Sequence, residues 1–155
     1  MEKLIVDFAL STSEAWESID KELILKDIFY SFNQTKVSIY SFPNFPNDFG
    51  IYIFFLKPEH VFKDCESLMD VWNIDSFRKY PKVIKKRFRE CEAKDRWFPF
   101  YIGKSENLGK RVNEHLSHHS QHATYGLKLK DRTEFLRNDK IEVGFWKLPE
   151  MGSVP

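Results

Sequence analysis

The chain has 155 residues, of which 42% are hydrophobic and 16% aromatic, and its formal net charge is +1. This length predicts one domain, residues 1–155, and is too short for two independent cores. No run of about eighteen apolar residues is present, which excludes a membrane-spanning helix, and the first ten residues lack the basic-then-apolar pattern of a secretion signal. We therefore expect a cytoplasmic protein in which the two cysteines, Cys65 and Cys91, are not paired.

The near-zero total hides an uneven distribution of charge. Residues 1–75 hold 6 Lys/Arg and 13 Asp/Glu, a net charge of −7, whereas residues 76–155 hold 18 Lys/Arg and 10 Asp/Glu, a net charge of +8. The total by itself says nothing about partners. The basic half, however, could face a polyanion such as nucleic acid.

The first 45 residues form an N-terminal extension in this interpretation. Apolar residues recur with near-helical spacing over residues 12–32, and residues 36–40 alternate as in a short strand. A cluster of turn residues at 43–48 ends the extension. The continuous apolar run that follows, residues 49–56, predicts a buried central strand.

Residues 58–97 are interpreted as a helical insertion, with two helices separated near Tyr80-Pro81. From residue 78 to 96 there are nine Lys/Arg and three Asp/Glu. Such a stretch either forms a solvated helix face or contacts phosphates, and both alternatives stay open.

A second strand is predicted at residues 98–102, where Gly103 ends it at a tight turn. Ser105 then serves as N-cap for a helix over residues 106–118, whose apolar stripe repeats every fourth position. Gly109 is unusual inside a helix. Residues 124–130 alternate, and residues 140–147 alternate as a third main strand. These elements predict an α+β fold, with a small, mainly antiparallel, three-stranded sheet flanked by helices.

Four polar side chains fall where strand and helix geometry can bring them together. Tyr52 and Tyr101 lie on neighbouring predicted strands, and Arg111 and His115 are four residues apart on one helix face. Arg111 offers a fork of donors suited to two phosphate oxygens, and Lys104 is placed to favour the ionised form of a tyrosine. The alternatives are core packing for each tyrosine and, for Arg111, an ion pair with one of two nearby glutamates, Glu106 and Glu114.

The same residues carry a resemblance to the GIY-YIG endonuclease superfamily. Gly50-Ile51-Tyr52 matches one half of its motif and Tyr101-Ile102-Gly103 the other, with Lys104 directly after and Arg111 seven residues beyond that lysine. The resemblance covers roughly residues 48–147. It implies a metal-dependent nuclease that acts on DNA, with RNA also possible.

The resemblance also implies roles for these residues. Tyr52 would position or deprotonate the attacking water, Tyr101 and Lys104 would support it, Arg111 would contact the scissile phosphate, and His115 would serve in proton transfer. We predict further nucleic-acid contacts from the basic half of the chain: Lys85, Lys86, Arg87, Arg89, Lys110, His118, His119 and Lys128.

Members of this family close the site with a glutamate that holds one divalent cation, Mg or Mn. Here Glu150 is the candidate ligand, ahead of Glu142 and Glu134. Either the chain is truncated before the usual glutamate, or the ligand comes from elsewhere, or the protein lacks metal-dependent activity. The last case leaves a second hypothesis, a module that binds nucleic acid or protein through the same basic pocket without cutting.

Four of the five histidines lie within residues 115–122, and their spacing could ligate zinc. The surrounding stretch, residues 117–124, is polar, and no cysteine or second cluster completes a coordination shell. Solvated or phosphate-facing imidazoles are the preferred interpretation.

Overall fold

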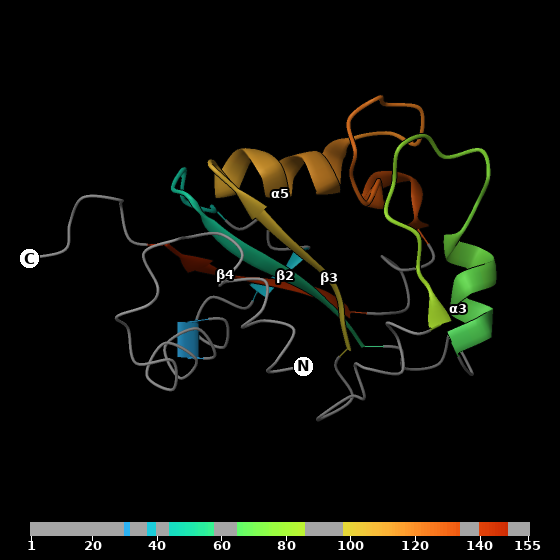
Figure 1. The fold of residues 1–155 in the computed structure, drawn as a ribbon, viewed down its shortest axis with the longest axis horizontal. Helices are drawn as coiled ribbons and strands as arrows, with labels where there is room; N and C mark the ends of the chain where they lie inside the picture. Colours follow the sequence, from blue (N-terminus) through green and yellow to red (C-terminus); the bar gives the residue numbers. More distant parts are fainter. Residues whose placement is uncertain are drawn as a thin grey trace, which may run out of the picture.

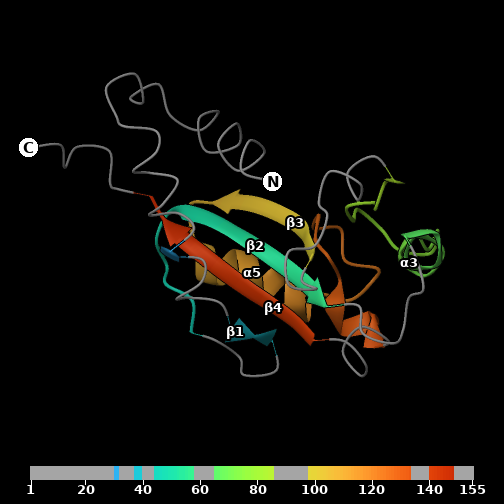
Figure 2. The ribbon, with the colours of Figure 1, turned by 90° about the horizontal axis from the view of Figure 1, so that it is seen from below.

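The computed structural model describes residues 30–31, 37–39, 44–57, 65–85, 98–133 and 140–148. Within these residues, four strands form one antiparallel sheet in the order β1, β4, β2, β3, and Figure 2 shows β4 and β3 on either side of β2. The strands are β1 (Val37–Ser38), β2 (Gly50–Lys57), β3 (Phe98–Ser105) and β4 (Lys140–Lys147).

The predicted α+β fold is confirmed. The three long strands lie where the sequence placed them, and the short strand β1 adds a fourth member at the sheet edge, where residues 36–40 alternate. Helix α5 (Leu108–Ser117) packs along one face of the sheet, and α3 (Cys65–Trp72) lies beyond one end of it (Figure 1). Among the described residues, no helix is long and apolar enough to cross a bilayer.

Strand β2 is the centre of the core. Its residues Ile51, Tyr52, Ile53, Phe54 and Leu56 are at most 1% exposed, which fits a strand covered on both faces. Successive side chains of a strand alternate between faces. The rings of Tyr52 and Phe54 both lie beside the imidazole of α5 residue 115, so the even-numbered residues face the helix.

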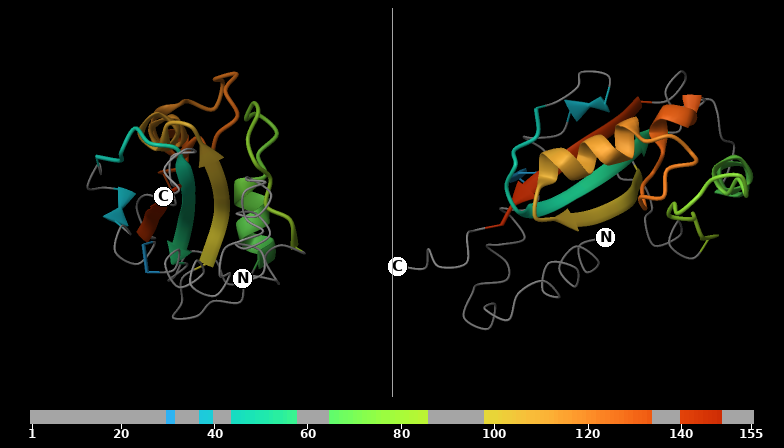
Figure 3. Two further views of the ribbon diagram at one scale, coloured as in Figure 1. Left: turned by 60° about the vertical axis from the view of Figure 1, so that its left-hand side comes forward. Right: turned by 90° about the horizontal axis from the view of Figure 1, so that it is seen from above.

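The prediction that Gly103 ends its strand at a tight turn is wrong. Strand β3 continues through Gly103 and Lys104 to Ser105, which pairs with Gly50 at the start of β2. Figure 3 shows the two strands side by side and running in opposite directions. Because Ser105 is still part of the strand, the N-cap of α5 is Asn107, whose side chain accepts a hydrogen bond from the backbone N–H of residue 110 at 2.7 Å. The helix accordingly begins two residues later than predicted.

Gly109 is explained by the loop that precedes β2. The backbone N–H groups of Leu108 and Gly109 donate to the carbonyls of Asp48 and Pro46, at 3.0 and 2.8 Å. A Cβ on Gly109 would come within 2.7 Å of the Phe45 carbonyl oxygen. The first turn of α5 therefore needs a glycine at this position, because the loop backbone lies against it.

The described part of the insertion, residues 65–85, contains α3 and then an irregular segment. The indole Nε1 of Trp72 donates to the Pro81 carbonyl at 2.7 Å, which folds the segment back on the helix. The second predicted helix falls mainly on residues 86–97, outside the described residues, as does Cys91. Of the predicted helix over residues 12–32, only residues 30–31 are described, and they are helical.

The alternation over residues 124–130 does not produce a strand. The chain there forms a loop and the short 3-10 helix η4 (Leu129–Asp131), preceded by Lys128 in the left-handed conformation with φ of 57°. Residues 126–129 are all buried, so the polar and apolar positions do not divide between a solvent face and a core face as the pattern predicted.

Candidate active site

The two motif glycines make room for neighbouring groups. Gly103 lies directly opposite Tyr52 in the sheet, and a Cβ there would overlap the Tyr52 hydroxyl and ring carbon Cζ. A Cβ on Gly50 would overlap the Trp146 carbonyl oxygen and lie 2.8 Å from Cδ1 of Leu108. The aromatic ring of Tyr52 thus packs directly against Gly103. Any larger residue at position 103 would displace the ring.

The hydroxyl of Tyr52 is hydrogen-bonded to Nε2 of His115 at 2.8 Å, and both residues are buried. The other ring nitrogen of His115, Nδ1, accepts the backbone N–H of Leu127 at 2.9 Å. A neutral imidazole that accepts at Nδ1 carries its proton on Nε2. His115 therefore donates to Tyr52, and the tyrosine keeps its own O–H proton for another partner.

Burial sets the protonation of this pair. It raises the pKa of the Tyr52 hydroxyl far above its usual range, the neighbouring Tyr101 adds to the rise, and Arg111 opposes it. Burial also lowers the pKa of His115 well below its usual range, with the nearby positive charges of Arg111 and Lys128 acting in the same direction. At neutral pH the pair is a neutral phenol and a neutral imidazole.

Arg111 lies beside the pair and is tied to two other groups. Its Nη1 donates to the carboxylate of Glu114 and its Nη2 to the carbonyl of Tyr125, both at 2.6 Å. The ion pair with Glu114, one of the two alternatives for this arginine, is therefore present. A guanidinium has five N–H donors, so these two bonds leave others for a ligand.

Tyr101 completes the group. Its ring centroid lies 6.1 Å from that of Tyr52 and 5.0 Å from that of His115, and the residue is half-buried. Of the five predicted catalytic residues, the structure therefore brings four together: Tyr52, Tyr101, Arg111 and His115.

Lys104 is not part of this group, and its predicted place beside Tyr52 is wrong. Gly103 faces Tyr52, so the next residue of the strand points to the opposite face of the sheet, together with its partner Ile51. Lys104 is exposed there. Its ammonium is consequently not the group that acts on the tyrosine.

The predicted nucleic-acid contacts divide by position. Lys110 and His119 are exposed, whereas His118 is half-buried and stacks on His122 with ring centroids 4.4 Å apart. Lys85 is exposed and paired with Glu66. Three further candidates, Lys86, Arg87 and Arg89, lie outside the described residues.

Lys128 corrects one of these predictions. The residue is fully buried, and its ammonium donates to the loop carbonyls of His122, at 2.9 Å, and Thr124. A lysine whose donors are taken by internal carbonyls does not present them to a phosphate. Its charge instead stabilises the loop that follows α5 and acts on His115 from inside.

The described residues assemble no group of three or more His, Cys, Asp or Glu side chains that could hold a metal ion. The histidines do not gather as zinc ligands: His115 points to Tyr52, whereas His119 lies 3.4 Å from the carboxylate of Asp131 and stacks on His122. Glu150, the predicted ligand of Mg or Mn, lies outside the described residues.

The sequence interpretation missed the groups that hold the site from the side of the loop. These are the backbone N–H of Leu127, the carbonyl of Tyr125 and the buried guanidinium of Arg132, which donates from Nε to the Leu127 carbonyl at 2.8 Å. Backbone groups leave no signature in a sequence. Arg132 gives no signal either, because it lies in a stretch of mixed charged and apolar residues like many surface segments.

Comparisons of the chain with protein-family models, with curated proteins and with solved structures find no match. They therefore add nothing for or against the motif resemblance. What the chain does has to be inferred from the geometry of the Tyr52 site and from the residues around it.

Proposed function

We propose that this chain is a nuclease that hydrolyses phosphodiester bonds in DNA, with RNA as a possible second substrate, through a site of the GIY-YIG kind. The observation that carries the proposal is the hydrogen bond between Tyr52 and His115. The Tyr52 ring occupies the space that the missing side chain of Gly103 leaves, and Arg111 lies directly beside the pair. A buried phenol, imidazole and guanidinium in contact are the residue types that phosphoryl transfer uses for proton handling and charge neutralisation.

In this proposal Arg111 is the residue that binds the scissile phosphate. It is half-buried and its present partners are a carboxylate and a carbonyl, Glu114 and Tyr125. Phosphate oxygens can replace the carboxylate, since both are anions that accept paired N–H donors. A guanidinium held on the phosphate would stabilise the charge that develops on it in the transition state.

Tyr52 would position the attacking water. Only 1% of the residue is exposed in the resting protein, so its hydroxyl becomes accessible when Arg111 moves from Glu114 to the phosphate. The hydroxyl is held by the Nε2–H of His115 and also interacts with Arg111 and Tyr101, so a water would take the place that Arg111 leaves when it moves to the phosphate. Because the pKa of this phenol is raised, positioning by hydrogen bonds is the role that suits its resting state better than that of an ionised base.

We further propose that activity depends on one divalent cation, Mg or Mn, as the family resemblance implies. The cation would stabilise the leaving oxygen when bound. The described residues do not fit such an ion, because they offer no cluster of three ligands and because Glu114 is bound to Arg111. We therefore assign none of the steps above to the cation.

Cleavage of supercoiled plasmid DNA with magnesium or manganese tests the proposal. We expect Arg111→Ala and Tyr52→Phe each to lower the cleavage rate by roughly 100-fold, the typical effect of removing one transition-state donor. Asn113→Ala is the matched control, since Asn113 is exposed on the same helix and is not among the predicted site residues, and we expect it to change the rate by less than about threefold. Wild-type rates in both site variants would remove the assigned site.

The second candidate function is a module that binds nucleic acid or a partner protein without cutting. One observation favours it: among the described residues, no group of three or more His, Cys, Asp or Glu side chains could hold the cation that cleavage is proposed to need. Salt-dependent DNA binding without cleavage under any divalent metal would support this candidate. A lack of DNA binding at low salt would count against the nuclease and against nucleic acid as the module's ligand.

A further inference from the structure

One short loop, residues 125–127, touches both polar side chains of the site that come from α5. The Tyr125 carbonyl accepts from Arg111 and the Leu127 N–H donates to His115 Nδ1. The second of these bonds decides which nitrogen of His115 carries the proton. The position of the loop therefore determines what His115 offers to Tyr52.

Arg132 holds that loop from the side of the segment that contains α3. The residue is fully buried, and its guanidinium carbon lies 3.7 Å from the ring centroid of Trp72 and 4.2 Å from that of Phe77. Its Nε donates to the Leu127 carbonyl at 2.8 Å and its Nη1 to the Trp72 carbonyl at 2.7 Å. One side chain thus joins the loop at residue 127 to the segment that contains α3.

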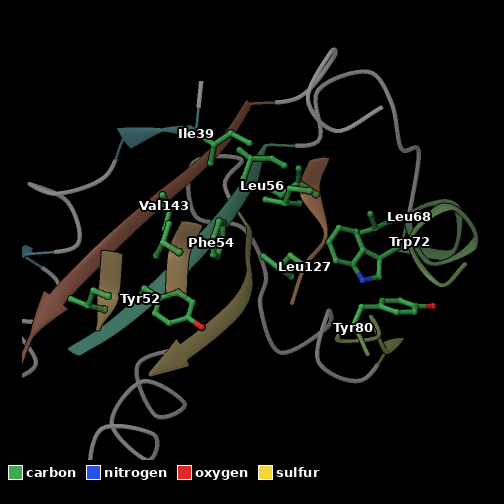
Figure 4. Close-up of a cluster of buried hydrophobic side chains, with 13 residues drawn as sticks. Ile39, Tyr52, Phe54, Leu56, Leu68, Trp72, Tyr80, Leu127 and Val143 are labelled. Atoms are coloured by element: carbon green, nitrogen blue, oxygen red, sulfur yellow. The ribbon is translucent and has the colours of Figure 1, made fainter. Parts of the chain in front are cut away.

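The segment and the loop are joined by backbone bonds as well. The N–H of Gly126 donates to the Lys79 carbonyl at 3.0 Å, and the N–H of Arg78 donates to the Ser120 carbonyl at 2.9 Å. In Figure 4, Leu127 lies between the group that contains Trp72 and the strand residue Phe54. The loop is therefore held between the sheet and the insertion.

We propose that Arg132, held between the rings of Trp72 and Phe77, is a positioning residue that fixes the protonated nitrogen of His115 through Leu127. The chain of contacts runs from the aromatic rings to the guanidinium, from its Nε to the Leu127 carbonyl, and from the N–H of the same residue to His115 Nδ1. The insertion, which is remote from the motif residues in sequence, thereby sets the state of the site.

The tautomer part of the inference concerns the folded protein alone and does not depend on catalysis. Its catalytic consequence rests on the proposed function: with the Nε2–H no longer fixed, the Tyr52 hydroxyl loses its donor and the water it positions is displaced. Cleavage should then slow while DNA binding, which depends on Arg111 and surface cations, stays unchanged.

The tautomer of His115 can be measured by long-range 1H–15N correlation spectra of protein labelled at histidine. In the wild type we expect Nε2 to be protonated and Nδ1 unprotonated. In Arg132→Met, which keeps the side-chain volume and removes both donors, we expect the ratio of the two tautomers to fall by about fivefold, the effect of losing one typical hydrogen bond. An unchanged ratio in the folded variant would overturn the proposal.

Two other variants distinguish a specific effect on the His115 tautomer from a general defect in folding. Phe77→Leu keeps Arg132 and removes one ring from its guanidinium, so we expect a smaller fall in the tautomer ratio, about twofold. If Arg132→Met does not fold, this variant decides the outcome, and an unchanged ratio overturns the proposal. Tyr80→Phe is the matched control: it keeps the third ring, 5.0 Å from the guanidinium, and loses only the hydroxyl bond to Ile74, so the ratio should not change.

Cleavage assays on the same proteins separate the two proposals. We expect Arg132→Met to lower kcat by about tenfold at unchanged affinity for DNA, whereas Tyr80→Phe leaves kcat at the wild-type value. Absence of cleavage in the wild type would remove the proposed function, and the spectra would still decide the inference. A changed tautomer with an unchanged kcat would overturn its catalytic consequence.

Discussion

Among the described residues, the Tyr52–His115 pair and the guanidinium of Arg132 are buried polar groups that lie among aromatic rings, and they differ in what they can do. In the first, Tyr52 and His115 share a hydrogen bond between two neutral groups of shifted pKa. In the second, Arg132 keeps its charge between Trp72 and Phe77 and donates to two backbone carbonyls.

The difference teaches which of the two can take part in chemistry. A phenol and an imidazole can each gain or lose a proton, and their environment decides when they do so. A guanidinium stays protonated throughout the range of protein chemistry, so its contribution is to hold neighbours in place. Under the proposed function, the Tyr52 pair is the one that contacts the attacking water, and Arg132 is the one that holds the loop beside it.

The largest expected effect comes from a side chain at position 103, in the space that the Tyr52 ring occupies. In Gly103→Ala the new methyl group would overlap the Tyr52 hydroxyl, so the ring must move. We expect a loss of about 3 kcal/mol in the free energy of unfolding, as for other overpacked cores, and a fall in cleavage rate of roughly 100-fold because the hydroxyl is displaced. Denaturant titration and plasmid cleavage check the two parts.

Gly126→Ala is the control for that substitution. A Cβ on Gly126 would find its nearest neighbours, the Glu114 carbonyl oxygen and His115 Nδ1, at 3.7 Å, which is ordinary contact. We expect a change of less than about 1 kcal/mol, in the stabilising direction if the unfolded chain loses entropy. Equal losses of unfolding free energy in the two variants would mean that packing of the Tyr52 ring does not require a glycine at position 103.

An intermediate effect concerns pH and separates the two buried groups directly. The folded pKa of His115 lies below its unfolded value of about 6.5, so below that pH the unfolded chain binds the extra proton. His115 therefore contributes stability that is complete above about pH 6.5 and is lost, by up to about 1.4 kcal/mol per pH unit, as the pH falls toward the folded pKa. Arg132 contributes no such slope, because it is charged in both states.

Unfolding free energies measured between pH 5 and 7 would show this difference. We expect His115→Gln to have a shallower slope than the wild type over this range, and Arg132→Met to keep the wild-type slope at lower overall stability. Parallel curves for the wild type and His115→Gln would mean that the imidazole is not held neutral by the fold.

The smallest expected effect tests the boundary of the site. Lys104 points to the opposite face of the sheet from Tyr52, so Lys104→Ala should change cleavage by less than about twofold and stability by about 0.5 kcal/mol or less. This contrasts with the large loss expected for Arg111→Ala. A tenfold fall in the cleavage rate of Lys104→Ala would mean that the Lys104 ammonium acts in the site, and would contradict the strand register.

The residues that were placed correctly from sequence lie in regular elements. Tyr52 and Tyr101 follow from strands whose side chains alternate, and Arg111 and His115 follow from their spacing of four on a helix. In each case the repeat of the strand or helix determines which side chains share a face. The positions of the apolar residues then indicate which face is buried.

The errors have equally local causes. The sequence predicts that Lys104 acts on a tyrosine of the site, but Gly103 and Lys104 are adjacent residues of a continuing strand, so they lie on opposite faces of the sheet. Lys128 was assigned to the surface on its charge, although loop carbonyls satisfy its ammonium in the interior. Both outcomes depend on backbone paths and carbonyl positions that side-chain patterns do not encode.

The way in which the loop before β2 closes the first turn of α5 has a consequence for anions. The free N–H groups at the start of a helix commonly form a phosphate site, favoured by the helix dipole. Here the N–H groups of Leu108 and Gly109 donate to loop carbonyls, and Asn107 accepts the next one along the chain. A phosphate would find no unoccupied donors among those three amides, so under the proposed function we expect it at the guanidinium of Arg111 rather than at the start of the helix.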